Sequence, residues 1–271
     1  MKVRCENENV ILSEVRRLSL PLTLDCGEAF RWQCEEDGSW SGAAYGKFLN
    51  IKEENGEFVL KNTSLEDFEC VWRNYFDLDR DYAAICDRLK EDSLLSETID
   101  EYYGIRILNQ DPWEALVSFV ISQQNNIKRI KGIIKRLCDT YGTPICEGWN
   151  AFPSAEVLAD CTEADFEALG LGYRAKYVKR LADDVACGAI NLAEIKAMDL
   201  ESAKKALLSI YGVGEKVANC ARAFRISICA RFPIDVWMKR ALQYYPNGSP
   251  ECFAGARASH SNIFFTGQET I

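Results

Sequence analysis

The stretch at residues 207–220 reads LLSIYGVGEKVANC, and it decides how we interpret the rest of the chain. Its helical apolar spacing ends at Tyr211, a tight turn follows at Gly212-Val213-Gly214, and a second helix begins near Lys216. Because glycine lacks a Cβ, backbone N–H groups in such a turn can face outward, and the next helix adds the positive end of its dipole. The pattern predicts a phosphate-binding site, which we call the phosphate seat. A purely structural pair of helices joined by a glycine turn would give the same sequence pattern.

The N-terminal part, residues 1 to about 62, is predicted to form strands. Apolar and smaller side chains alternate over residues 18–24, and further β-type runs flank Asp37-Gly38 and Asn55-Gly56. Asp-Gly and Asn-Gly between such runs indicate hairpins whose two turn residues both have φ > 0. We therefore expect an antiparallel sheet with a helix over one of its faces.

From about residue 64 the apolar spacing becomes helical. Asp111, Pro112 and Glu114 form a helix start with an N-cap, a first-turn proline and an acid at the third position. Polar residues 122–126 separate two apolar helical stretches, and Gly142 ends the second. Further helices are expected after Ser154, after Thr162, over residues 177–188 and over residues 203–210.

The fold class is therefore α+β, with a small N-terminal antiparallel β-sheet domain followed by a larger all-helical region. We place the first domain, with its flanking helices, at residues 1–110 and the helical region at residues 111–271.

The chain of 271 residues has a net charge of −9, which argues against a protein that coats nucleic acid. The charge is unevenly distributed, however. Residues 122–240 contain 18 basic and 14 acidic residues, and the remainder contains 14 basic and 27 acidic residues. Because the local field governs binding, the acidic total does not exclude phosphate binding by the basic segment, and any nucleic-acid affinity should be modest and salt-sensitive, with few phosphates contacted.

Cysteine and histidine usage excludes several kinds of site. The 12 cysteines are scattered without a C-x-x-C pair, and His260 is the single histidine. Zinc ribbons, iron–sulfur clusters and sites with two histidine ligands are therefore not expected. No signal peptide or membrane-length apolar run is present, so we expect reduced thiols in a cytoplasmic protein.

A second feature lies about twenty residues beyond the glycine turn, where Asp235 follows Pro233-Ile and is placed to cap a helix. With this feature the chain resembles the helix-hairpin-helix DNA glycosylase superfamily, and within it the 8-oxoguanine DNA glycosylase branch. Five stretches carry the resemblance in the expected order, at residues 26–32, 118–129, 169–176, 212–220 and 233–240.

The resemblance implies a catalytic pair. Lys216 would attack C1′ of the damaged nucleotide, expel the base and form a Schiff base that permits β-elimination. Asp235 would stabilise the cationic sugar. A lysine amine has an ordinary pKa of about 10.4, so we expect burial, the helix end or a nearby acceptor to assist it. Taken singly, the two residues could be a solvated lysine and a helix cap, but their spacing favours the catalytic pair.

The resemblance also implies how the base is read after it is flipped out of the duplex. 8-Oxoguanine carries a hydrogen on N7, which the backbone carbonyl of Gly27 would accept. The base would stack between Cys220 and Phe264, although Phe264 could equally be a core aromatic residue. His260 falls where the family usually has a glutamine that reads the base edge. Alternatively, the tail is shifted by one or two residues and His260 lies on the surface.

Other family positions concern the gap that the flipped base leaves and the orphaned cytosine. The matching residues are Gln124, Arg129, Tyr173 and Arg174. The family often has asparagine in place of Gln124. For the two arginines the alternative is a solvated helix surface. Gly212, Val213 and Gly214 would bind phosphate.

Together these features predict a base-excision repair enzyme, an N-glycosylase with abasic-site lyase activity that prefers 8-oxoguanine opposite cytosine. We expect a monomer of bacterial or archaeal type, with duplex DNA as partner, no membrane association and no metal or organic cofactor. The alternatives are a glycosylase for another purine lesion, such as an alkylated purine, and a non-catalytic helix-hairpin-helix module that only binds DNA.

Overall fold

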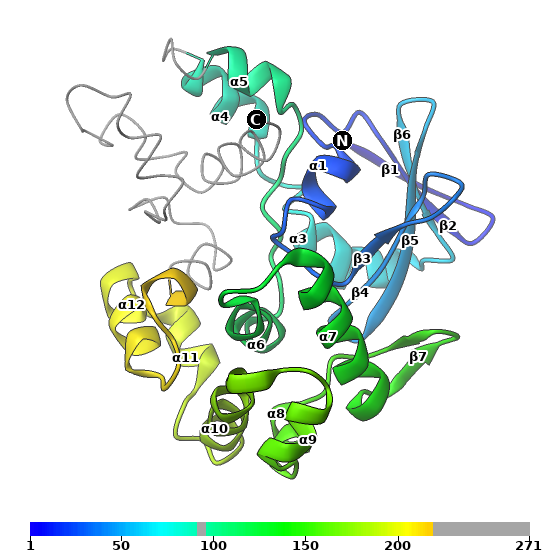
Figure 1. The fold of residues 1–271 in the computed structure, drawn as a ribbon. Helices are drawn as coiled ribbons and strands as arrows, with labels where there is room; N and C mark the ends of the chain where they lie inside the picture. Colours follow the sequence, from blue (N-terminus) through cyan, green and yellow to red (C-terminus); the bar gives the residue numbers. More distant parts are fainter. Residues whose placement is uncertain (91–95, 219–271) are drawn as a thin grey trace. The chain divides into compact units, whose positions relative to one another are not determined.

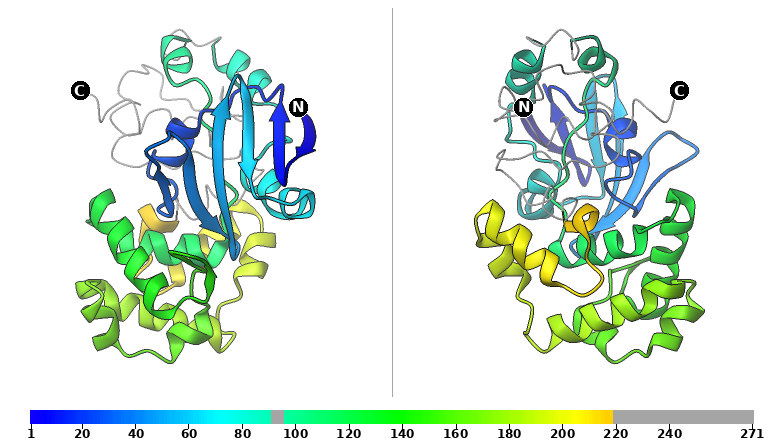
Figure 2. Two further views of the ribbon diagram at one scale, coloured as in Figure 1. Left: turned by 90° about the vertical axis from the view of Figure 1, so that its right-hand side faces the viewer. Right: turned by 60° about the vertical axis from the view of Figure 1, so that its left-hand side comes forward.

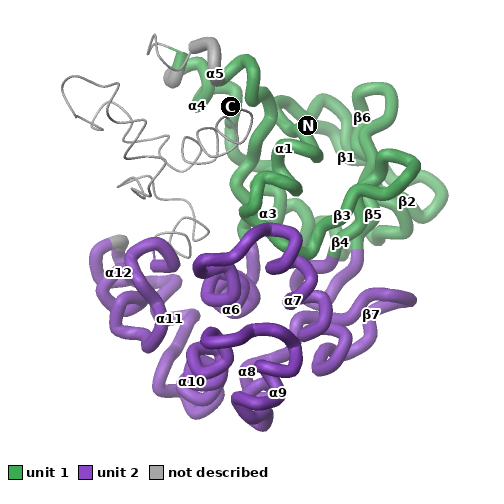
Figure 3. Tube along the Cα trace, viewed as in Figure 1, with its two compact units in different colours: residues 1–42, 49–109, 227–271 green, residues 43–48, 110–226 purple. Residues whose placement is uncertain are grey.

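The computed structural model describes residues 1–90 and 96–218 of the chain (Figure 1). Its described residues form two compact units (Figure 3). The first contains residues 1–42 and 49–109, apart from the undescribed 91–95, and the second contains residues 43–48 and 110–218.

A six-stranded sheet dominates the N-terminal unit, and its strands follow the order β1-β2-β6-β5-β4-β3. The strands lie side by side in the left view of Figure 2. The β1–β2, β2–β6, β5–β6 and β3–β4 pairs run antiparallel, as the sequence predicted. The strand bounds are Lys2–Glu6 (β1), Asn9–Ser13 (β2), Trp32–Cys34 (β3), Trp40–Ala44 (β4), Lys47–Glu54 (β5) and Glu57–Lys61 (β6).

The two predicted hairpin turns differ in the structure. Asn55 and Gly56 both have positive φ, 51° and 78°, and they join β5 to β6 as a two-residue turn, which confirms that prediction. Between β3 and β4 the prediction was wrong in detail. Only Gly38 has positive φ there, because the Asp37 carboxylate accepts a hydrogen bond from Ser39 N (2.9 Å) and a five-residue loop forms.

The expectation of a strand over residues 18–24 was also wrong. Leu20–Leu24 forms a short helix, α1. Ser19 caps this helix by accepting a hydrogen bond from Leu22 N, and Pro21 occupies its first turn. These helix-start signals outweigh a short alternation of apolar residues.

A helical segment capped by Ser64 packs against Trp32 of the sheet, as expected for a covered face. It consists of α2 (Leu65–Asp67), a π-helical turn η1 (Phe68–Trp72) and α3 (Arg73–Tyr75). The Trp32 indole N–H donates to the Tyr75 hydroxyl at 2.8 Å. Gly42 lies directly against the Trp32 ring, where a Cβ would come within 2.3 Å of a ring carbon, so only glycine fits. Helices α4 (Tyr82–Leu89) and α5 (Ser96–Glu101) follow along the chain.

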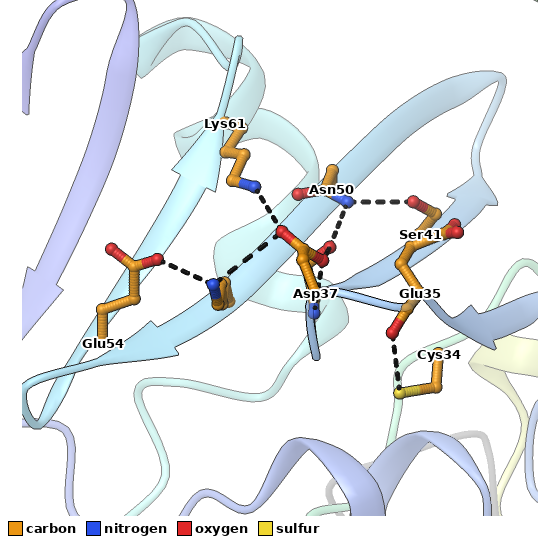
Figure 4. A network of polar contacts seen from close by, with 9 residues as sticks. Cys34, Glu35, Asp37, Ser41, Asn50, Glu54 and Lys61 are labelled. Carbon is orange, nitrogen blue, oxygen red and sulfur yellow. Dashed lines mark hydrogen bonds and ion pairs between the residues drawn. The ribbon is translucent and has the colours of Figure 1, made fainter.

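Paired charges occupy the β3–β6 part of the sheet (Figure 4). The Asp37 carboxylate lies 3.2 Å from Lys61 Nζ and 3.8 Å from Lys52 Nζ. Hydrogen bonds from Ser39 and the contact with Lys61 lower the pKa of Asp37 well below its ordinary value. Asn50 Nδ2 adds hydrogen bonds to the hydroxyls of Ser39 and Ser41.

The second unit is mainly helical. The described elements are α6 (Pro112–Ser122), α7 (Ile127–Tyr141), β7 (Pro144–Cys146), β8 (Trp149–Asn150), α8 (Ala155–Ala159), α9 (Glu163–Ala168), η2 (Gly172–Arg174), α10 (Ala175–Ala186), α11 (Leu192–Ala197) and α12 (Leu200–Ser209). Helix α6 forms the core of the unit, because all its residues from Glu114 to Ile121 are buried. The α+β fold class predicted from the sequence is confirmed.

The predicted caps are present at the helix starts. The Asp111 carboxylate accepts hydrogen bonds from Trp113 N (3.0 Å) and Glu114 N (2.9 Å). Ser154 and Thr162 cap α8 and α9. The β7–β8 hairpin and α11 were not predicted. No helix among the described residues is both long and apolar enough to cross a membrane.

Candidate functional site

The hairpin predicted from residues 207–220 is present in the helical unit. Helix α12 ends at Ser209, Gly212 has φ of 83°, and the next helix starts at Glu215. Ala218 N donates to Gly214 O at 2.9 Å, which closes the first turn of that helix. The predicted phosphate-binding residues therefore stand between two helices, at the N-terminal end of the second.

The two hairpin glycines differ in what surrounds them. A Cβ on Gly212 would lie 2.5 Å from the Tyr177 ring, so both packing and a positive φ require glycine there. A Cβ on Gly214 would meet nothing within 4 Å among the described residues. Packing within residues 1–90 and 96–218 therefore does not explain the glycine at 214, and the open space beside it suits the approach of a ligand.

Lys216 lies in the first turn of the second helix, beside Gly214, and it is exposed. The sequence interpretation expected burial to help activate this amine, and the described residues do not supply that burial. The neighbouring acid Glu215 is engaged elsewhere, because its carboxylate lies 2.8 Å from Lys204 Nζ.

The polar interruption predicted at residues 122–126 is a loop between α6 and α7, and Gln124 adopts a left-handed conformation in it (φ 48°). Arg174 holds this loop through its main chain. Arg174 Nε donates to Gln123 O at 2.8 Å, and Nη2 donates to the carbonyls of Gln123 and Gln124, the latter at 3.0 Å. Nη1 donates to Leu171 O at 3.2 Å.

Arg174 is therefore not the solvated surface residue that we considered as an alternative. It is 3% exposed, and its guanidinium lies 4.4 Å from the centre of the Tyr173 ring. In this structure it supports the loop backbone, so contact with a cytosine would require it to give up some of these bonds.

The other predicted gap residues surround the same loop. Gln124 and Arg129 are exposed, and Tyr173 is 48% exposed. The Tyr173 hydroxyl donates to Gln123 O at 3.2 Å, and Arg129 Nη2 donates to Gly170 O at 3.3 Å. The structure thus brings together side chains that the sequence separates by about 50 positions.

Sequence reasoning missed Gln123 and Tyr177. Gln123 Nε2 donates to Gly212 O at 2.9 Å, which joins the loop to the hairpin. The Tyr177 ring lies behind Gly212 and contacts the Tyr211 ring at 5.2 Å between centroids. The adjacent Gln123-Gln124 pair was visible, but no spacing rule tells which amide faces the hairpin.

Gly27 belongs to the N-terminal unit, where it lies between α1 and β3 with φ of 82°. Its neighbour Cys26 is buried, and burial together with the nearby Glu28 carboxylate raises the pKa of the Cys26 thiol. The remaining predicted site residues lie outside the described residues: Asp235, Cys220, Phe264 and His260. Within the described parts of the chain, no three His, Cys, Asp or Glu side chains gather as a metal site would require.

Two family models together match most of the chain. The 8-oxoguanine DNA glycosylase N-terminal domain matches residues 10–116, and the HhH-GPD superfamily of base excision DNA repair proteins matches residues 117–251. A solved structure is similar over the whole length, that of the Clostridium acetobutylicum 8-oxoguanine glycosylase/lyase in complex with DNA containing cytosine opposite 8-oxoguanine. Its TM-score is 0.91 at 33% identity, covering 100% of this chain and 98% of the other. The chain belongs to the 8-oxoguanine DNA glycosylase family.

Curated members of this family extend the comparison. The N-glycosylase/DNA lyase OGG1 of Arabidopsis thaliana is 29% identical over 81% of this chain and 64% of its own length. The N-glycosylase/DNA lyase of Saccharomyces cerevisiae is 30% identical over 82% of this chain and 67% of its own length. This chain thus spans about two thirds of these relatives. The family predicted from the sequence is confirmed, and both relatives carry the predicted enzyme class in their names.

Proposed function

We propose that this chain excises 8-oxoguanine opposite cytosine from duplex DNA and then nicks the strand through a Schiff base on Lys216. The main support is the hairpin, where Lys216 is exposed beside the open space at Gly214 in a member of this family. The first-turn N–H groups of the helix that starts at Glu215 and its positive end would seat a DNA phosphate.

The chemistry follows from an amine next to a deoxyribose carbon. Lys216 Nζ bonds to C1′ as the C1′–N9 bond breaks, and the departing base takes the electron pair and then a proton. The sugar ring opens to give a C1′=N Schiff base. Loss of a C2′ proton expels the 3′ phosphate, which nicks the strand. Asp235 would stabilise the positive charge on the sugar, and bound DNA would cover the amine that is exposed here.

Lesion recognition is assigned by family position. The Gly27 carbonyl would accept the N7 hydrogen of 8-oxoguanine, Cys220 and Phe264 would stack on the base, and His260 would face its Watson–Crick edge. Stacking is worth about 1–3 kcal/mol per base.

The gap in the duplex would be filled from the 122–126 loop. Gln124 would enter the gap, and Arg129, Tyr173 and Arg174 would contact the cytosine. The exposed positions of Gln124, Arg129 and Tyr173 support this assignment. We place the enzyme in the cytoplasm as a monomer with duplex DNA as its partner.

Single-turnover cleavage of matched duplexes tests this function. The substrates carry 8-oxoguanine opposite cytosine, 8-oxoguanine opposite adenine, an alkylated purine, or undamaged guanine. We expect the first to be cut fastest, and Lys216→Gln to slow its cleavage about 1,000-fold or more, as removal of a nucleophile does. Preference for the alkylated purine would instead identify a glycosylase for another lesion. Duplex binding without cleavage of any lesion would identify a non-catalytic module.

A further inference from the structure

Gln123 is bound on both sides, by its main chain and by its side chain. Its carbonyl accepts hydrogen bonds from Arg174 Nε (2.8 Å) and the Tyr173 hydroxyl (3.2 Å). Its side-chain amide donates to Gly212 O at 2.9 Å. One residue therefore connects the loop that contains Gln124 to the hairpin.

The hairpin end of this connection is well defined. Gly212 is the residue whose Cα packs against the Tyr177 ring, so the ring blocks its movement toward α10. Gln123 Nε2 holds the same peptide through its carbonyl. Two residues further on, Gly214 faces the open space of the proposed phosphate seat.

The loop end is equally defined. Gln123 is the C-cap residue of α6, and its backbone N–H donates to Val120 O. Gln124 follows at once with φ of 48°, a left-handed conformation that non-glycine residues rarely adopt. The direction in which the Gln124 side chain leaves the loop thus depends on how the Gln123 peptide is held.

We propose that Gln123 is a positioning residue that sets the phosphate-binding hairpin and the Gln124 side chain at a fixed separation on the DNA. This role deepens the proposed function and rests on it. A duplex holds its phosphates and its base stack at set distances, so the two elements can act together only if their spacing matches. Gln123 makes this connection with a single amide, without touching substrate itself.

The test uses Gln123→Met, which keeps the side-chain length and the backbone carbonyl but removes the N–H donor. The control is Asn125→Leu in the same loop. It removes two bonds that do not reach the hairpin, from Asn125 Nδ2 to Ile121 O (3.2 Å) and from Asn126 N to Asn125 Oδ1 (3.1 Å). We expect Gln123→Met to slow single-turnover excision of 8-oxoguanine about 5- to 10-fold, the size of one hydrogen bond, and Asn125→Leu to have less effect.

A double-mutant cycle with Gln124→Ala separates positioning from general structural damage. If Gln123 acts through Gln124, its substitution slows excision about 5- to 10-fold in the wild-type background and less than about 2-fold in the Gln124→Ala background. An equal slowing in both backgrounds, or the same slowing by Asn125→Leu, would overturn the proposal.

The same cycle can be measured without catalysis. Binding is followed to a duplex that carries a tetrahydrofuran abasic-site analogue opposite cytosine. Failure of the wild-type chain to excise any lesion contradicts the proposed function. Additive effects of Gln123→Met and Gln124→Ala on duplex affinity would contradict the positioning role. The two failures are therefore distinguishable.

Discussion

Arg106 in the N-terminal unit and Arg174 in the helical unit make the same kind of contacts but support different parts of the protein. Each is 3% exposed, donates to main-chain carbonyls and lies 4.4 Å from the centre of a tyrosine ring. Arg106 binds the carbonyls of Arg16, Arg17 and Asp77.

The two arginines differ in the exposure of the tyrosine and of the segment that each one contacts. The ring beside Arg106 is that of Tyr82, which is itself buried, and its hydroxyl donates to Asp77 at 2.9 Å. The ring beside Arg174 is that of Tyr173, which is half exposed, and the loop it supports presents Gln124 to solvent. A buried guanidinium thus stabilises a core in one unit and an exposed loop in the other. We therefore use exposure to separate the groups that hold the proposed site from those proposed to face its ligand, and Arg174 would join the second set only by releasing some of its bonds to the loop.

The largest effects should come from removing these two arginines. We expect Arg106→Leu and Arg174→Leu each to lower the free energy of unfolding by about 3–4 kcal/mol, because each leaves several buried or part-buried carbonyls without their donors. Urea denaturation measures this loss. Arg180→Leu is the control, because its ion pair with Asp184 lies on the surface and should contribute little.

DNA binding then separates the two arginines. Under conditions where both variants remain folded, only Arg174→Leu should weaken binding to a duplex with an abasic-site analogue, since only Arg174 supports the exposed loop. Equal weakening by Arg106→Leu would contradict the comparison.

The next effect concerns Gly212, which we class with the groups that hold the site. Gly212→Ala combines a positive φ with overlap on the Tyr177 ring, and we expect a loss of about 2–3 kcal/mol in unfolding free energy. Gly46→Ala provides the match, because Gly46 also has positive φ (71°) but would place its Cβ in open space. It should cost about 1 kcal/mol. Equal losses of unfolding free energy in the two variants would show that overlap with the Tyr177 ring does not destabilise Gly212→Ala.

We class Gly214 instead with the groups proposed to face the ligand. Gly214→Ala should leave stability unchanged or slightly raised, because the new methyl group meets none of the residues that the structure describes and the unfolded state loses freedom. Its affinity for duplex DNA should fall about 10-fold, since the methyl group would occupy the proposed phosphate seat. Fluorescence anisotropy with a labelled duplex measures this, and undiminished affinity would argue against the seat.

The smallest effect should come from the charge network of Figure 4, because its ion pairs are partly exposed to solvent. The pKa of Asp37 is lowered in the folded state, so its carboxylate stabilises the protein at neutral pH. This stabilisation is lost as the pH falls below the ordinary aspartate value of about 3.9. Asp37→Asn should therefore lower Tm slightly at pH 7, and the difference should shrink below pH 4. A difference that grows in acid would contradict the sign.

The features that could be predicted from the sequence are local ones. Asp111 and Pro112 start α6 as expected, because a cap and a first-turn proline act within four residues. The 18–24 segment was misjudged because seven residues of alternation are too few to outweigh Ser19 and Pro21, which start a helix there.

The parts of the site that escaped prediction depend on contacts between distant segments. Arg174 reaches the carbonyls of Gln123 and Gln124 from about 50 residues away, and Gln123 reaches Gly212 from 89 residues away. Main-chain carbonyls are the same for every residue type, so a side chain that binds them leaves no complementary residue in the sequence. Family position predicted Arg174 as a site residue, but only the structure shows that it binds the carbonyls of the 122–126 loop.

The central claim is that the Lys216 amine bonds to the damaged nucleotide, and covalent capture tests it most directly. The wild-type chain is incubated with an 8-oxoguanine:cytosine duplex and borohydride, which reduces a Schiff base to a stable amine. Protease digestion and mass spectrometry then locate the adduct. Our account predicts a single adduct on Lys216 that disappears in Lys216→Gln. An adduct on another lysine, or one that persists at full yield in Lys216→Gln, would contradict it.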